Sequence, residues 1–174
     1  CAAARGLVAA GWTEDARLAI KGGSAGGGTV LPALTTSRAF TAGISRYGVA
    51  DLRALASDTH DFEAHYLDGL VGPLPEAEAV YVERSPLSRI DALRVPVLLL
   101  QGADDPVVPP AQAYAVRDAL TAKGVRHALV VYEGESHGFR RAETIQHALE
   151  SELSFLGQVF GFATPGVPVL PLEP

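Results

Sequence analysis

Methionine is absent from the 174 residues, and cysteine occurs only once, at position 1. A single cysteine excludes an internal disulfide bond and any metal site built from several cysteines. Basic residues are also few, since 14 Lys and Arg stand against 20 Asp and Glu and give a net charge of −6. An acidic chain without a basic cluster argues against nucleic acids and anionic membranes as binding partners.

Long apolar runs are missing as well. Val95–Leu100 is a run of only six residues, whereas a bilayer-spanning helix needs about 20. The chain also begins without the charged, apolar and cleavage regions of a signal peptide, so we expect no membrane segment. The absence of cysteine pairs is compatible with a cytoplasmic location, which is our expectation.

The missing methionine means that the chain does not begin at its own start codon unless it has been processed. We therefore expect it to be the C-terminal part of a longer polypeptide, entered within a helix. A mature protein that is lipid-anchored at Cys1 is the alternative.

The remaining composition is that of an ordinary globular protein, with 48% hydrophobic and 20% charged residues. It excludes a disordered, collagen-like or disulfide-framework protein, and the length suits one domain. Segments of strand character alternate with segments of helical periodicity. The expected strands are Arg17–Gly23, Phe40–Tyr47, Val95–Leu100 and His127–Tyr132. The expected helices are Ala2–Ala10, Ala25–Ser37, one or two within Asp51–Leu70, Glu76–Arg84, Ala111–Lys123 and Arg141–Phe160.

This alternation predicts an α/β fold with a mostly parallel sheet and helices on both faces. We expect residues 1–162 to form a partial catalytic domain and residues 163–174, which include four prolines, to form an extended, loosely held tail. In the last helix, an apolar stripe recurs at three- and four-residue steps and consists of Ile145, Leu149, Leu153 and Leu156.

The strongest motif lies between the first predicted strand and the helix after it. The segment from Gly22 to Gly26 fits G-x-S-x-G, the turn that lifts a nucleophilic serine above the end of a strand. We expect the turn to be so sharp that side chains at positions 22 and 26 would collide, which explains both glycines. Ser24 is then the candidate nucleophile, and the backbone N–H of Ala25 is the candidate oxyanion donor. A phosphate-binding turn is the alternative, but no G-x-x-x-x-G-K-[ST] sequence is present.

Two further segments supply the partners that such a serine needs. Asp104 and Asp105 follow a buried strand, and either carboxylate could orient a histidine or instead cap the next helix. His137 lies in the glycine-flanked loop after the last strand, at the same predicted sheet edge. For the other histidines we expect a packing or solvated role; they are His60, His65, His127 and His147. The order Ser…Asp…His, with each member after a different strand, is that of α/β-hydrolase triads.

Taken together, these segments resemble the catalytic domain of the prolyl oligopeptidase family of serine peptidases, and in particular its acylaminoacyl-peptidase and dipeptidyl-aminopeptidase branches. The resemblance covers nearly all of residues 1–162. It rests on the runs Gly22–Gly27, Tyr47–Leu52, Arg84–Pro86, Pro96–Gly102, Asp105–Pro109 and Ser136–Phe139. It implies the C-terminal half of an α/β-hydrolase fold and the hydrolysis of short peptides through an acyl-enzyme, without a metal or other cofactor.

The resemblance also implies roles for single residues. Ser24 is the nucleophile and His137 is the general base. The family pattern G-x-x-D-x-x-V-P selects Asp105 over Asp104 as the third member of the triad. Ala25 supplies one oxyanion N–H. The remaining assignment is Tyr47, which lines the pocket for the side chain before the scissile bond.

Complete members of the family carry an N-terminal β-propeller and further sheet strands upstream, with a tyrosine hydroxyl as the second oxyanion donor. These parts are the expected partners of this chain, and association into a homo-oligomer is left open. Without them the strand Arg17–Gly23 has an unpaired edge, so we expect the isolated chain to aggregate or swap strands and to be nearly inactive. A carboxylesterase or other acyl hydrolase of the same fold, and a noncatalytic hydrolase-like module, are the alternatives.

Overall fold

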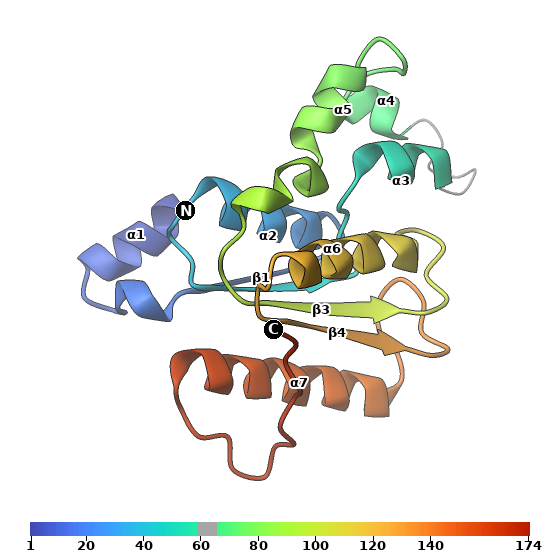
Figure 1. Ribbon diagram of the computed structural model, residues 1–174. Helices are drawn as coiled ribbons and strands as arrows, with labels where there is room; N and C mark the ends of the chain where they lie inside the picture. Colours follow the sequence, from blue (N-terminus) through green and yellow to red (C-terminus); the bar gives the residue numbers. More distant parts are fainter. Residues whose placement is uncertain (59–65) are drawn as a thin grey trace.

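The predicted strands form a single sheet (Figure 1). The computed structural model describes residues 1–58 and 66–174. Its strands are β1 (Ala19–Gly23), β2 (Ala42–Arg46), β3 (Val97–Gly102) and β4 (His127–Tyr132), in the spatial order β1-β2-β3-β4. All neighbouring pairs are parallel, which confirms the predicted α/β class. β1 starts later than predicted because Asp15–Arg17 forms a short 3₁₀ turn.

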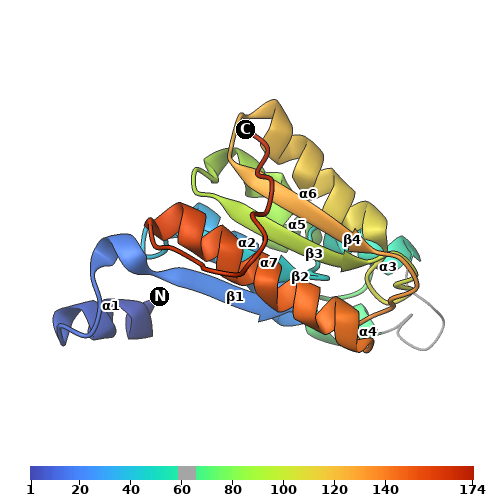
Figure 2. The same ribbon diagram turned by 90° about the horizontal axis from the view of Figure 1, so that it is seen from below.

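Helices cover both faces of the sheet, as predicted. α2 (Ala25–Thr36) and α6 (Pro110–Ala122) pack on one face, and α7 (Ala142–Phe160) packs on the other (Figure 1 and Figure 2). β3 is buried along its whole length, and its side chains alternate between the two layers. Val97 and Leu99 join the core beside α2 and α6, whereas Leu98 and Leu100 join the core beside α7. This two-sided burial explains why the strand is apolar at consecutive positions.

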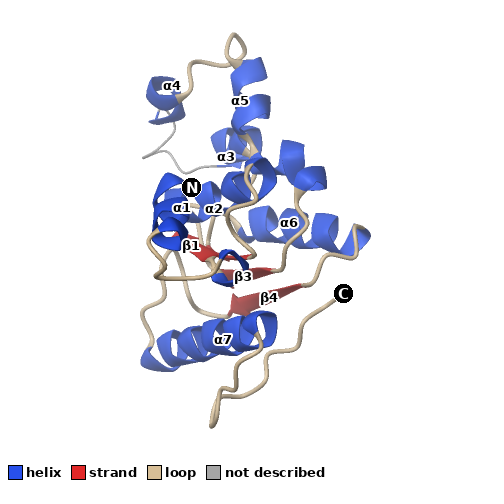
Figure 3. Ribbon diagram, turned by 90° about the vertical axis from the view of Figure 1, so that its left-hand side faces the viewer, coloured by secondary structure: helices blue, strands red, loops and turns tan. Residues whose placement is uncertain are grey.

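The connection between β2 and β3 holds a further group of helices. It contains α3 (Leu52–Asp58), α4 (Tyr66–Leu70), α5 (Glu78–Arg84) and the 3₁₀ segment η3 (Pro86–Ala92). α3, α4 and α5 stand beyond the layer of α2 and α6, on the side away from the sheet (Figure 3). α1 (Ala2–Ala9) precedes β1 in sequence. Within residues 1–58 and 66–174, no helix is long and apolar enough to cross a membrane.

α7 turns a different face to the sheet from the one that its apolar stripe suggests. Three of the four stripe residues, Ile145, Leu149 and Leu153, are 41%, 52% and 43% exposed, whereas the fourth, Leu156, packs against the core as expected. The buried positions of the helix are mostly small or polar: Thr144, Ala148, Ser151, Glu152, Ser154, Phe155 and Gly157. Small side chains let the helix approach the sheet closely.

Ion pairs hold α7 in this rotation. The buried carboxylate of Glu152 accepts Lys21 Nζ of β1 and Arg46 Nε of β2, each at 2.6 Å. Because a buried carboxylate is stable only when it is paired, these two cations keep Glu152 against the sheet.

The expectation that the proline-rich tail is loosely held is wrong. Glu173 forms an isolated antiparallel bridge with His127, with N···O distances of 3.0 and 2.7 Å. Leu170 and Leu172 pack against the core on the α7 side, and Leu170 N donates to Ser154 Oγ at 2.8 Å. The tail is held because β4 is the last strand of the sheet and its outer edge offers backbone partners.

β1 lies at the opposite edge of the sheet and pairs only with β2 within the described residues. Figure 2 shows this strand along the border of the sheet, with α7 crossing the sheet in front of it. The outer backbone groups of β1 therefore face away from the four-stranded sheet, which is the geometry expected from the sequence.

The rotation of α7 yields a test with a matched control on the same helix. Phe155 is fully buried between α7 and the sheet, so Phe155→Ala is expected to lower the free energy of unfolding by about 3–5 kcal/mol. Leu149→Ala, on the exposed stripe, is expected to change it by no more than about 0.5 kcal/mol. Urea denaturation followed by circular dichroism measures both values, and equal losses at the two positions would contradict the observed rotation.

Candidate active site

Ser24 occupies the junction between β1 and α2 in a conformation that L-residues rarely adopt. Its φ is 55° and its ψ is −123°. A Cβ at Gly22 would lie 2.3 Å from the backbone oxygen of Gly26, so the strand and the helix approach too closely for any side chain at position 22. A Cβ at Gly26 would meet no atom within 4 Å. The predicted collision therefore explains Gly22, whereas for Gly26 it is wrong.

The structure brings together the three side chains of the predicted triad. His137 Nε2 lies 2.8 Å from Ser24 Oγ, and His137 Nδ1 lies 2.8 Å from Asp105 Oδ2. Ser24 follows β1, Asp105 follows β3 and His137 follows β4. Because the strands are parallel, all three positions lie at the carboxyl edge of the sheet.

Asp105 is held in a buried turn by several donors. Its Oδ1 accepts the backbone N–H groups of Val107 and Val108, both at 2.9 Å. Its Oδ2 accepts Gln101 Nε2 at 3.3 Å, and Gln101 is itself fully buried. Asp104 is exposed and does not take this place. Of the two candidate aspartates, the one selected by the family pattern is therefore the one that contacts His137.

Tyr47 packs against the imidazole of His137. The two ring centroids are 4.9 Å apart in an edge-on arrangement, and the Tyr47 ring also meets Phe139 edge-on at 5.3 Å. A Cβ at Gly23 would come within 3.1 Å of the Tyr47 ring, so Tyr47 lies close to the serine turn. Tyr47 is not among the described residues that line the cavity beside Ser24, which differs from the expectation that it lines the substrate pocket.

Two of the four remaining histidines, His127 and His147, lie within the described residues. His127 is buried in β4 and its Nδ1 lies 2.8 Å from the backbone oxygen of Val125. His147 on α7 has its Nδ1 3.0 Å from the hydroxyl of Tyr132. Both have structural partners, as expected. His60 and His65 lie outside the described residues.

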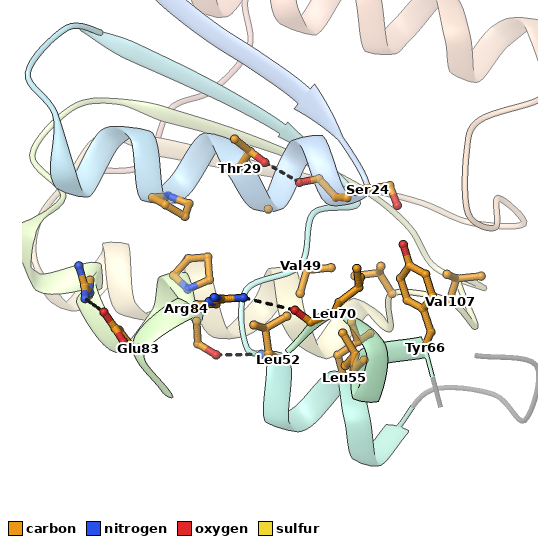
Figure 4. A pocket seen from close by; sticks show the side chains of 18 of the residues that line it. Ser24, Thr29, Val49, Leu52, Leu55, Tyr66, Leu70, Glu83, Arg84 and Val107 are labelled. Atoms are coloured by element: carbon orange, nitrogen blue, oxygen red, sulfur yellow. Dashed lines mark hydrogen bonds and ion pairs between the residues drawn. The ribbon is translucent and has the colours of Figure 1, made fainter. Parts of the chain in front are cut away.

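A cavity of about 740 Å³ opens beside Ser24 and His137 (Figure 4). One wall is the outer side of α2, and the other comes from the connection between β2 and β3. Much of that second wall is apolar and consists of Val49, Leu52, Leu55, Leu67, Leu70 and Pro86. Its charged members are Glu83, Arg84 and Arg89, and Val107, from the segment after β3, also lines the cavity. Sequence reasoning missed this wall, because its residues are scattered through a polar segment and share no motif. The one feature of the sequence that could have indicated this wall is the recurrence of leucine in the β2–β3 connection, which is far longer than is needed to join two strands.

The backbone N–H of Ala25 belongs to the first turn of α2, directly after Ser24. N–H groups in the first turn of a helix have no partner within the helix. The positive end of the helix dipole adds to the field at this point. This position therefore suits a donor to an oxyanion that forms at the serine. Among the described residues, no group of three or more His, Cys, Asp or Glu side chains is arranged to hold a metal ion.

A buried carboxylate that the sequence did not reveal lies next to this site. Glu135 is only 2% exposed. Burial raises its pKa, but the backbone N–H groups of Arg141 and Arg140, the Thr144 hydroxyl and the Arg141 charge outweigh burial and hold the pKa below the usual 4.5. Because the pKa of Glu135 is lower in the folded state than in the unfolded state, its ionisation stabilises the fold at pH values above the unfolded-state pKa. This stabilisation is lost as the pH falls through the folded-state pKa.

The asymmetry between the two glycines of the turn is testable. Gly22→Ala is expected to destabilise the protein by about 1–3 kcal/mol or more, because the added methyl group overlaps the backbone at Gly26. Gly26→Ala is expected to be neutral or to stabilise by about 0.5–1 kcal/mol, because alanine favours a helix and the space is open. Chemical denaturation of both variants checks this, and a comparable loss for Gly26→Ala would disprove the open space.

Comparisons with known proteins agree with this geometry. Residues 1–163 match the model of the prolyl oligopeptidase family. Dipeptidyl aminopeptidase BIII of Pseudoxanthomonas mexicana is 34% identical over 160 residues, which are 88% of this chain and 23% of that protein. The solved structure of a Mycobacterium tuberculosis puromycin-hydrolyzing peptidase is 51% identical with a TM-score of 0.95, over 99% of this chain and 26% of that chain. The solved structure of Pyrococcus horikoshii acylaminoacyl peptidase is 21% identical with a TM-score of 0.84, over 94% of this chain and 27% of that chain. At this level of identity the likeness supports the fold alone.

The chain thus spans about a quarter of the length of these relatives. The structural neighbours are α/β-hydrolase peptidases, which confirms the predicted fold class. The resemblance drawn from the motifs is confirmed as well, because the family match covers nearly the whole chain. This chain belongs to the prolyl oligopeptidase family.

Proposed function

We propose that this chain is the C-terminal part of the catalytic domain of a serine peptidase that hydrolyses short peptides. The observation that carries the proposal is the continuous series of hydrogen bonds from Ser24 through His137 to Asp105, with each bond to the imidazole 2.8 Å long. A serine, a histidine and a buried carboxylate in this order form the hydrogen-bonded arrangement that activates a hydroxyl for acyl transfer.

The proposed reaction runs through an acyl-enzyme. His137 Nε2 takes the proton from Ser24 Oγ as the oxygen attacks the peptide carbonyl, and Asp105 holds the imidazole in the required tautomer. The tetrahedral intermediate collapses, the C–N bond breaks, and His137 donates its proton to the leaving amine. Water then attacks the ester, with His137 as the base, and releases the acid and the free serine. The N–H of Ala25 and the N-terminus of α2 stabilise the oxyanion in both steps.

The cavity beside Ser24 supports a substrate with a large apolar group next to the scissile bond. Leucine and valine side chains form much of its wall, and the charged residues Glu83, Arg84 and Arg89 also line it. Solved relatives with 47–51% identity are named for hydrolysing puromycin. We include puromycin among the proposed substrates, together with short peptides.

The open edge of β1 supports a second part of the proposal. We infer that upstream strands of the same polypeptide pair with β1, and that a β-propeller precedes them as in the family. One oxyanion donor then comes from outside the 174 residues, and loss of one such donor costs about 10²–10³-fold in turnover. The isolated chain is therefore expected to associate through β1 and to be nearly inactive, so a test of activity requires the full-length polypeptide.

The role of Ser24 is tested by labelling. In the full-length polypeptide, Ser24→Ala is expected to abolish both peptide hydrolysis and covalent labelling by a serine-directed phosphonate, because no other hydroxyl lies against His137 Nε2 in the described structure. Mass spectrometry of the labelled protein locates the modified residue. Labelling that persists in the variant would exclude Ser24 as the nucleophile.

The two adjacent aspartates provide a matched pair. Asp105→Asn is expected to lower kcat by about 10⁴-fold, because the amide can favour the wrong imidazole tautomer. Asp104→Asn is expected to leave kcat within about twofold, because the Asp104 side chain is exposed. Steady-state kinetics with one peptide substrate measures both. A severe loss at position 104 with a mild one at position 105 would exchange their roles.

A further inference from the structure

The loop between β4 and α7 presents His137 on a tight turn. Ser136 and Gly138 form an isolated bridge, and Gly138 has a φ of 92°, which favours glycine. Four residues, Ser136–Phe139, separate Glu135 from Arg140. The imidazole at the tip of this turn makes two hydrogen bonds in opposite directions. Both bonds require the loop to be held in one place.

The carboxylate of Glu135 closes this loop at its base. Glu135 Oε2 accepts the backbone N–H of Arg140 at 2.9 Å, and Oε1 accepts the backbone N–H of Arg141 at 3.0 Å. Arg141 Nε also lies 3.5 Å from Oε1. One buried side chain before His137 therefore binds the main chain after it and ties the loop to the start of α7.

The backbone of Glu135 also reaches the loop that carries Asp105. Its carbonyl oxygen accepts the backbone N–H of Asp104 at 2.9 Å. A Cβ at Gly102 would lie 2.5 Å from that oxygen, so the end of β3 and Glu135 are in close contact. The same residue is thus fixed relative to the Asp105 loop through its main chain and relative to α7 through its side chain.

We propose that Glu135 is a positioning residue for His137, whose carboxylate holds the loop so that the imidazole reaches Ser24 and Asp105 together. This inference rests on the function proposed above and adds a residue that acts on the reaction only through His137. Ionised Glu135 accepts two N–H groups at once, and a neutral amide at this position accepts one and directs its own N–H₂ group at the other.

The test compares two identical substitutions in one loop of the full-length polypeptide. Glu135→Gln is expected to lower kcat by about 10²-fold, the size of effect that a displacement of about 1 Å has on a reacting group, with KM unchanged. It is also expected to weaken the downfield proton NMR signal of the His137 imidazole N–H. The control Glu133→Gln, at an exposed position two residues earlier, is expected to leave kcat within about twofold.

A second variant covers the case in which Glu135→Gln does not fold. Thr144 is 5% exposed, and its hydroxyl is one of the groups that lower the pKa of Glu135, so Thr144→Val leaves the carboxylate in place with one favourable group fewer. It is expected to lower kcat by a smaller factor, again with KM unchanged. If the variant that folds keeps the wild-type kcat and imidazole signal, Glu135 only stabilises the start of α7 and the inference is wrong.

The two proposals fail in different ways. If the phosphonate does not label Ser24 in the wild-type protein, the proposed function is wrong whatever the Glu135 variants do. If Ser24 is labelled at the same rate in the wild-type protein, Glu135→Gln and Glu133→Gln, the proposed function is supported and the proposed positioning role of Glu135 is wrong.

Discussion

The position of one imidazole depends on the register of the parallel sheet. Ser24, Asp105 and His137 follow three different strands, so the distances between them are set by where each strand ends. In the last ladder Gly102 pairs with Tyr132, the final residues of β3 and β4. A slip of one residue would move a loop by about 3.3 Å, which exceeds the range of a hydrogen bond. The buried strand β3, apolar on both sides, makes such a slip costly because its alternate side chains fill two different cores.

Two buried carboxylates attach α7 to the same framework. Glu152, in the second half of the helix, pairs with Lys21 and Arg46 on the first two strands. Glu135, just before the helix, accepts main-chain donors at its start. Because an unpaired buried charge is costly, each carboxylate persists only with its donors in place. The helix that follows His137 is therefore fixed both in its rotation and at the end nearest the proposed reaction.

The proposed chemistry and the proposed selectivity reside on different parts of the fold. The triad side chains come from loops at the edge of the sheet, whereas the apolar cavity wall comes from α3, α4 and the segments beside them (Figure 4). A change in the β2–β3 connection can therefore alter the cavity without moving the imidazole. This separation fits a family in which one reaction is combined with different substrates.

Patterns among near neighbours in the chain were enough to predict the four strands, the main helices, the turn at Ser24 and the order of the serine, the aspartate and the histidine. The same patterns did not distinguish Asp104 from Asp105 as the partner of the histidine, and it is the fold that brings the Asp105 carboxylate to the imidazole. The tertiary structure also places the Tyr47 ring edge-on against the imidazole and pairs Glu152 of α7 with Lys21 and Arg46. These outcomes depend on contacts between residues far apart in sequence, and a local pattern of hydrophobicity contains no information about which distant charge or ring will be adjacent.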